Sequence, residues 1–218
     1  LQIVKLQWSF ANENEAENEF EKAIKNYDEI KSENIASYAG RAELRSLICL
    51  LKAGKMEGEY ISRAEKALRD IKSHEQLKED LAYRLGLYFL KACRADDAEE
   101  VFSKYLSEFD NNLKKMCQIA RLQWAKSVVD NVNKELEGFI NNEVSAQDAE
   151  STIDNLQYGS DLGDAERILG IEGTLSSVIE SISKYVQRKC FEEEEYVSAI
   201  RHIINDNPKY LNNTTVFH

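Results

Sequence analysis

The sequence predicts an all-α fold, an array of antiparallel helix hairpins closed by a helical C-terminal cap. One proline and nine glycines in 218 residues leave few turn formers for a sandwich or a barrel. Apolar residues recur at helical spacing along most of the chain, and runs of alternating β-branched residues are missing. We therefore expect hairpins over residues 1–135 and a helical capping region over residues 136–218.

The first two hairpins follow from apolar stripes separated by polar breaks. Residues 1–32 carry one stripe around Trp8 and a second around Phe20 and Ala23. Residues 44–51 and 60–68 carry the stripes of the second hairpin, and Gly54 between them predicts the end of a helix.

The third hairpin, over residues 79–112, has the most informative pattern in the chain. Gly86 and Ala98 are small residues that let two helices approach closely, while Leu85, Phe89 and Phe102 fill the space around that contact. Ahead of it, Ser73 and Gln76 have the spacing of a capping box that would open its first helix.

This combination of small and large residues resembles the tetratricopeptide repeat (TPR), a helix hairpin that stacks into an α-solenoid. Similar hairpins precede it, and Ala23, Ala67 and Tyr105 occupy matching positions. Their spacing is longer than the regular repeat of about 34 residues, so the expected array is irregular. Leu1 falls inside the first helix of its repeat, which suggests a truncated start.

Beyond the third hairpin, residues 113–132 predict one more amphipathic helix, on which Met116, Ala120 and Trp124 recur at helical spacing. Turn-forming residues then become frequent from about Gly138. Amphipathic helices return at residues 174–190 and at about 194–205. Such a region commonly covers the open end of a repeat array, which is the role we expect for it.

Composition narrows the possible functions. The formal net charge of −11 disfavours binding to a phosphate backbone, and no segment has the roughly 20 uninterrupted apolar residues of a bilayer span. The four cysteines and three histidines are scattered, which argues against a disulfide framework or a zinc site. We expect a protein with reduced thiols that is cytoplasmic and holds no metal or cofactor.

The TPR resemblance implies a binding surface, because in that family the first helix of each hairpin lines a concave groove that holds a peptide or a partner helix. The positions that match this surface are Arg45, Cys49, Lys52, Tyr83, Leu87, Leu90 and Lys91. Arg45, Lys52 and Lys91 would form a basic strip on an acidic chain, suited to an acidic or C-terminal carboxylate ligand.

A second, shorter resemblance covers residues 113–190. Gly170-Ile171-Glu172-Gly173, with Arg121 and Lys126 upstream, looks like part of the helical lobe of the CRISPR adaptation integrases, in which the corresponding glutamate binds a metal ion. The same four residues also fit a simple helix entrance. A catalytic divalent ion needs several oxygen ligands, and Glu172 supplies one carboxylate.

The sequence thus predicts a non-catalytic protein–protein interaction module, an adaptor or scaffold. One alternative is a divalent-metal nucleic-acid enzyme lobe centred on Glu172. Another is an architectural segment that packs against the rest of a parent chain or against another subunit.

Overall fold

The computed structural model describes residues 2–141, 160–188 and 200–204, and these residues form helices joined by short turns, with no β-strand among them. The all-α prediction is confirmed. The helices are α1 (Gln2–Ala16), α2 (Phe20–Ser32), α3 (Ala36–Lys52), α4 (Gly58–Asp70), α5 (Glu75–Lys91), α6 (Ala95–Tyr105), α7 (Asn111–Ile140), α9 (Ser160–Leu169) and α10 (Thr174–Arg188).

The chain divides into two compact units, an N-terminal unit (Leu1–Ala120) and a C-terminal unit (Arg121–His218). The sequence placed the boundary at residue 135. Both positions lie inside α7, which is one continuous 30-residue helix. Apolar residues of the C-terminal part of α7, among them Ala125 and Leu136, belong to the core of the C-terminal unit. The boundary between the two units therefore lies earlier in the chain than predicted.

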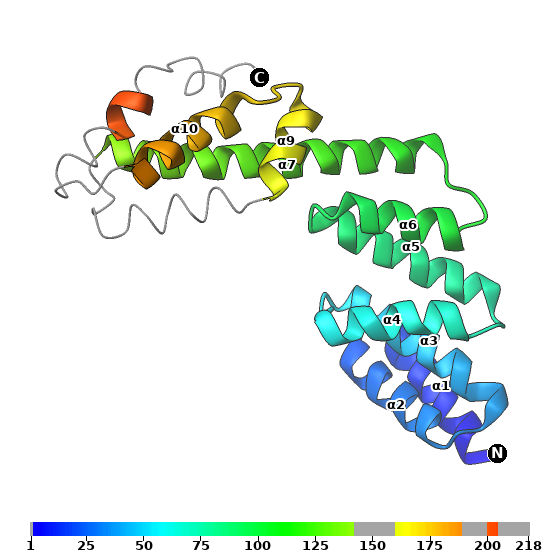
Figure 1. The fold of residues 1–218 in the computed structure, drawn as a ribbon. Helices are drawn as coiled ribbons and strands as arrows, with labels where there is room; N and C mark the ends of the chain where they lie inside the picture. The colour runs from blue at the N-terminus through cyan, green and yellow to red at the C-terminus, as the bar shows by residue number, and fades with distance from the viewer. Residues whose placement is uncertain (1, 142–159, 189–199, 205–218) are drawn as a thin grey trace. The chain divides into compact units, whose positions relative to one another are not determined.

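In the N-terminal unit, helices that follow one another in sequence lie next to one another (Figure 1). Helix α2 contacts α1 and α3, and α5 contacts α3, α4 and α6. As a result α3 and α5 are packed from more than one side. The buried residues of α3 include every residue from Ser46 to Leu50.

The same turn ends α1, α3 and α5. In each, a residue with left-handed backbone donates its amide to the carbonyl three residues earlier, and the next amide donates to the carbonyl five residues earlier. This is the Schellman arrangement. The left-handed residues are Asn18 (φ 61°), Gly54 (φ 68°) and Cys93 (φ 56°), so the helix stop expected at Gly54 is confirmed. The turn fixes a common register for the three helices despite their uneven spacing in sequence.

The start of α5 differs from the expected capping box. The helix begins at Glu75 after His74, whose backbone is left-handed (φ 66°), and no side chain caps its first amides. The prediction for Ser73 and Gln76 is therefore wrong, because the left-handed turn at His74 places the helix start one residue too late for that geometry.

The close approach of α5 and α6 is confirmed. A Cβ atom added to Gly86 would lie 2.2 Å from Cε1 of Phe102, well inside contact distance. Ala98, Leu85, Phe89 and Phe102 are all fully buried. Only glycine at position 86 lets the ring of Phe102 occupy this place in the core.

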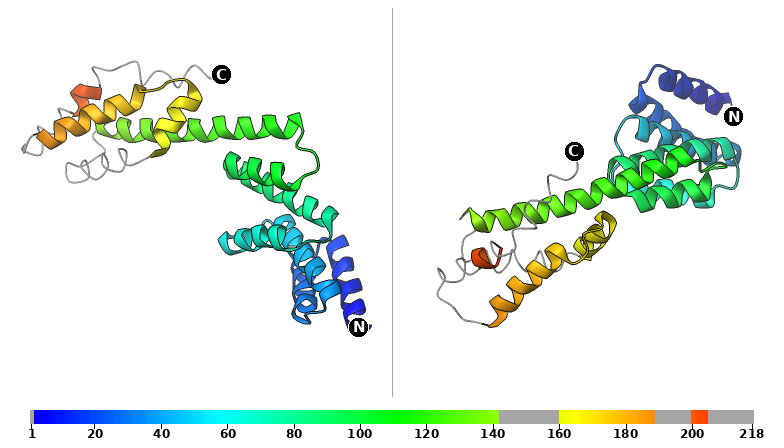
Figure 2. Two further views of the ribbon diagram at one scale, coloured as in Figure 1. Left: turned by 45° about the vertical axis from the view of Figure 1, so that its right-hand side comes forward. Right: turned by 90° about the horizontal axis from the view of Figure 1, so that it is seen from above.

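The C-terminal unit has a separate core. It is formed by apolar residues of the C-terminal part of α7, α9, α10 and the short helical segment 200–204, and Figure 2 shows these helices beside one another. The predicted helix start at residue 174 matches the beginning of α10. The segment expected at about 194–205 is described only for residues 200–204, which are helical, and its remainder lies outside the described residues.

We expect Gly86→Ala to destabilise the N-terminal unit by about 1–3 kcal/mol, because the added methyl overpacks against Phe102 and this cost exceeds the gain in helix propensity. Urea unfolding followed by circular dichroism measures the change. Gly58→Ala is the matched control, since a Cβ there meets nothing within 4 Å. Equal stability of the two variants would contradict the close approach, and Phe102→Leu should partly restore the Gly86→Ala variant.

Candidate interaction groove

The predicted groove residues lie on α3 and α5 as expected, but they differ in exposure. Cys49 is 0% and Leu90 8% exposed, so both side chains belong to the cores and offer no surface to a ligand. Tyr83 and Lys91 are exposed, and Leu87 is half-buried. The difference arises because α3 and α5 are packed from several sides, which leaves each a narrow free face.

Arg45 and Lys52 are held by a carboxylate of the first helix. Both Oε atoms of Glu15 accept hydrogen bonds from Nη1 of Arg45 at 3.2 Å, and Oε1 also accepts one from Nζ of Lys52 at 2.7 Å. The hydroxyl of Tyr27 donates to Glu15 Oε2 at 3.0 Å. We name these four residues the Glu15 cluster. It joins α1, α2 and α3, and it removes two of the three cations from the predicted basic strip.

The electrostatics of the Glu15 cluster follow from burial and charge. Burial alone would raise the pKa of Glu15, but the hydrogen bond from Lys52 and the charges of Arg45 and Lys52 outweigh it and hold the pKa below its ordinary value. Burial and the nearby Glu15 carboxylate raise the pKa of Tyr27. Burial raises the pKa of the Cys49 thiol to about 12, so this thiol is protonated and inert at neutral pH.

A shallow cleft of about 510 Å³ remains between the N-terminal half of α3 and the start of α5. It is lined by Arg41, Arg45, His74, Glu75, Gln76, Leu77 and Asp80. The guanidinium of Arg41 stacks over the ring of Trp8, with its Cζ 4.7 Å from the ring centroid. Asp80 accepts a hydrogen bond from Nε of Arg84 at 2.8 Å.

Arg41 is the cation of this cleft that can meet a ligand most directly. Arg41 is exposed, and within the described parts of the chain it forms no ion pair with a carboxylate. Stacking on Trp8 orders the side chain while its donor groups stay available. The cleft thus has Arg41 at one wall and the carboxylates of Glu75 and Asp80 at the other.

A second ion network joins α2, α3 and α4. Arg63 donates to Glu43 (2.7 and 2.8 Å) and to Asp28 (2.7 Å), and Lys31 pairs with Glu43 at 2.7 Å. Burial would raise the pKa of Glu43, but the hydrogen bonds from Arg63 and Lys31 lower it overall. These side chains satisfy one another's hydrogen-bonding groups, and the network therefore links the three helices structurally.

The Gly170–Gly173 segment is the turn between α9 and α10. Gly170 (φ 69°) and Gly173 (φ 75°) both have left-handed backbone, and Glu172 is exposed. Among the described residues no group of three or more His, Cys, Asp or Glu side chains is arranged to hold a metal ion.

The carboxylate that matters at this turn is Glu166, which the sequence did not single out. Its side chain is 1% exposed and accepts hydrogen bonds from the amides of Gly173 (3.2 Å), Leu175 (2.5 Å) and Ser176 (3.1 Å). The hydroxyls of Thr174 and Ser176 donate to it as well. Glu166 thus caps the first turn of α10, where free amides and the helix dipole favour a negative charge.

No family model, curated protein or solved structure matches this chain. No helix within the described residues is both long and apolar enough to cross a membrane.

We expect Glu15→Gln to destabilise the N-terminal unit by about 1–3 kcal/mol at pH 7, since the buried charged hydrogen bonds are weakened. Because the folded pKa of Glu15 is depressed, its contribution is present above the unfolded pKa and is lost as pH falls through the folded value. The free energy of unfolding of the parent should therefore fall more steeply than that of the variant as pH falls below the ordinary pKa of 4.5.

Urea unfolding in a Trp124→Phe background checks this, because Trp8 then becomes the single tryptophan reporter, and its ring lies 5.3 Å from that of Tyr27. Glu13→Gln is the matched control on the exposed face of α1. Parallel pH profiles for the parent and Glu15→Gln would contradict the lowered pKa of Glu15 in the folded protein.

At the second turn, Glu166→Ala should unfold α10 or destabilise the C-terminal unit by about 2–4 kcal/mol, because several buried donors lose their acceptor. Glu172→Ala should change stability by less than about 0.5 kcal/mol, as an exposed surface substitution does. Circular dichroism and hydrogen exchange of the α10 amides compare the two variants. The reverse order of effects would contradict the capping role of Glu166.

Proposed function

We propose that this chain is a non-catalytic protein–protein interaction module, with a TPR-like array of hairpins in its N-terminal unit. Support comes from the identical turns after α1, α3 and α5, and from the contact between α3 and α5, the first helices of successive hairpins. The Gly86–Phe102 contact supports the same reading, because it places a small residue at the crossing of the two helices of one hairpin.

The observation that carries the proposal is the cleft between α3 and α5. Its wall on α3 holds Arg41, stacked on Trp8, and its wall on α5 holds Asp80. At helical spacing along the same face of α5 follow Tyr83, Leu87 and Lys91. With Glu75 and Asp80, this surface offers two cations, an aromatic ring, an apolar side chain and two carboxylates to one bound segment.

The proposed ligand is a peptide whose carboxylates face Arg41 and Lys91, with apolar residues between them and no carboxylate against Glu75 or Asp80. Arg41 can donate two parallel hydrogen bonds to a carboxylate, and Lys91 can pair with another as a point charge. Arg45 contributes to the wall of the cleft, but its guanidinium is held by Glu15, so Arg41 takes the place that the sequence gave to Arg45 and Lys52.

The test begins with display selection of 12-residue peptides against the intact chain. We expect the enriched peptides to be acidic and to bind in fluorescence anisotropy titrations. Arg41→Ala should weaken the binding about tenfold, the loss expected when one charged hydrogen bond is removed. The matched control is Arg69→Ala, an exposed arginine of α4 that does not line the cleft.

Three outcomes would contradict the proposal. The first is that the selection enriches no binder, and the second is that Arg41→Ala binds as well as the parent. The third is that Arg69→Ala and Arg41→Ala weaken binding equally, which would indicate attraction by charge alone.

A further inference from the structure

The cleft between α3 and α5 holds charges of both signs on opposite walls. Arg41 lines it from α3, and Glu75 and Asp80 line it from α5. Within the described parts of the chain, Arg41 forms no ion pair with either carboxylate. The opposite charges of the two walls therefore do not satisfy one another, and the volume of about 510 Å³ leaves room for side chains of a ligand between them.

The two carboxylates of the α5 wall are only partly used by their own helix. Oδ1 of Asp80 accepts a hydrogen bond from Nε of Arg84 at 2.8 Å, and Oε2 of Glu75 lies 3.6 Å from Nζ of Lys78. Among the described residues no hydrogen bond reaches Oδ2 of Asp80. The side chains of Asp80 and Glu75 are 37% and 73% exposed. Since a carboxylate has about four acceptor sites, each can take a second cation from a ligand.

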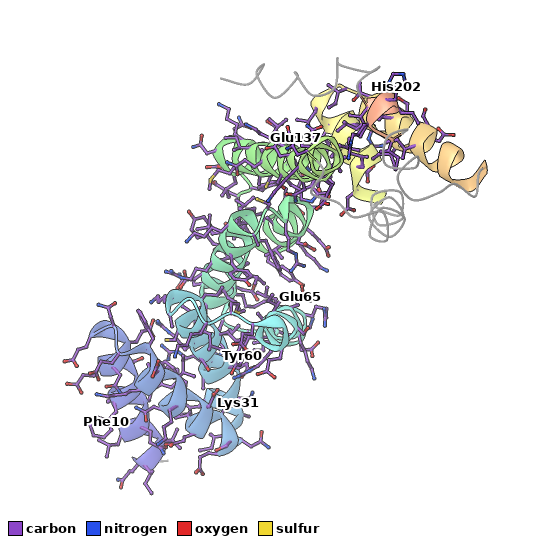
Figure 3. The ribbon with its side chains drawn as sticks, turned by 90° about the vertical axis from the view of Figure 1, so that its left-hand side faces the viewer. Phe10, Lys31, Tyr60, Glu65, Glu137 and His202 are labelled. Carbon is purple, nitrogen blue, oxygen red and sulfur yellow. The ribbon has the colours of Figure 1, made fainter. Side chains whose placement is uncertain are left out.

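The α3 wall offers its free positive charge at one place. Arg45 also lines the cleft, but its Nη1 donates to both carboxylate oxygens of Glu15. Lys31 of α2, labelled in Figure 3, pairs with Glu43 at 2.7 Å and does not line this cleft. Arg41 is therefore the position on this wall that a ligand carboxylate meets.

An extended peptide fits two walls of opposite charge in a defined way. Its successive side chains point to opposite sides of the backbone. In a cleft between two helices, one side chain therefore meets α3 and the next meets α5. A carboxylate that faces Arg41 is then followed or preceded by the side chain that faces Asp80 and Glu75, where a cation is favoured and a second carboxylate is repelled.

We propose that the cleft recognises an extended segment of a partner protein in which an acidic residue stands directly beside a basic one. The acidic side chain pairs with Arg41, and the basic side chain pairs with Asp80 and Glu75. This inference rests on the proposed function and specifies the charge pattern of its ligand.

The spacing along α5 extends the pattern. Lys91 follows Asp80 by eleven residues on the same face, a rise of about 16 Å along the helix. An extended segment covers that length with about five residues. A second carboxylate therefore stands about five residues beyond the basic side chain, so the ligand is acidic overall but carries a basic residue at a fixed place.

The probe is the strongest peptide that the 12-residue display selection enriches on the intact chain, labelled with fluorescein. We expect the enriched peptides to carry an acidic residue next to a basic one. A second peptide of the same composition has the basic residue moved by one position, so that its side chain points to Arg41. In anisotropy titrations it should bind the parent about fivefold more weakly, since one exposed ion pair is lost and the net charge is unchanged.

A double variant of the α5 wall and a matched control locate the effect. Glu75→Gln, Asp80→Asn should bind the two peptides equally, within about twofold. Glu59→Gln, Glu108→Gln removes two exposed carboxylates that do not line the cleft, and it should prefer the first peptide as the parent does. Both variants should keep the helical circular dichroism spectrum of the parent, because the substituted carboxylates are accessible to solvent.

The outcomes separate this inference from the proposed function. Enriched peptides without a basic neighbour, or equal binding of the two peptides to the parent, would overturn the charge pattern and leave the interaction module standing. A preference that survives in Glu75→Gln, Asp80→Asn, or that is lost equally in Glu59→Gln, Glu108→Gln, would also overturn it. A selection that enriches no binder overturns the proposed function, and the charge pattern with it.

Discussion

The N-terminal unit depends on the carboxylate of Glu15, which is buried between three helices and holds two cations of α3. A single buried carboxylate would be costly, but Arg45, Lys52 and Tyr27 together satisfy its oxygens. The cluster fixes α3 against α1 and α2, because the cations reach Glu15 in one register only. It also determines which cations of α3 are available to a ligand. Arg45 and Lys52 are hydrogen-bonded to Glu15, whereas Arg41, one helical turn before Arg45, stays available.

Other helices of the N-terminal unit are also joined by specific side-chain contacts, which differ in their chemistry. The Arg63 network links α2, α3 and α4 through charge, the Tyr88–Met56 hydrogen bond links α5 to the turn before α4, and the Gly86–Phe102 contact links α5 to α6 by shape. Each bridge joins a helix to one that lies near it in sequence. The contacts between helices of this unit are therefore mostly between elements close in sequence.

Much of the fold could be read from the sequence, and the failures have physical reasons. Apolar spacing predicted the helices, and the small residue at Gly86 predicted the crossing of α5 and α6, because these signals lie within one hairpin. The groove residues Cys49 and Leu90 were misplaced because burial from neighbouring hairpins depends on tertiary packing. Glu15 left a local signal: it continues the apolar series Val4 and Ala11 on the buried face of α1. A carboxylate in such a series indicates a buried ion pair, although its partners on α3 are 30 or more residues away.

Glu166 and Glu172 show that the role of a sequence motif depends on the residues around it. The two carboxylates lie six residues apart, and the one inside the Gly-Ile-Glu-Gly motif is exposed, whereas the one before it accepts the amides of α10. A glutamate between two glycines looks like a ligand because the glycines open the backbone. Here the left-handed glycines instead turn the chain so that the first amides of α10 point back at Glu166. The conformational freedom of glycine at this turn serves helix capping, and the charge that it exposes at Glu172 is a by-product of that geometry.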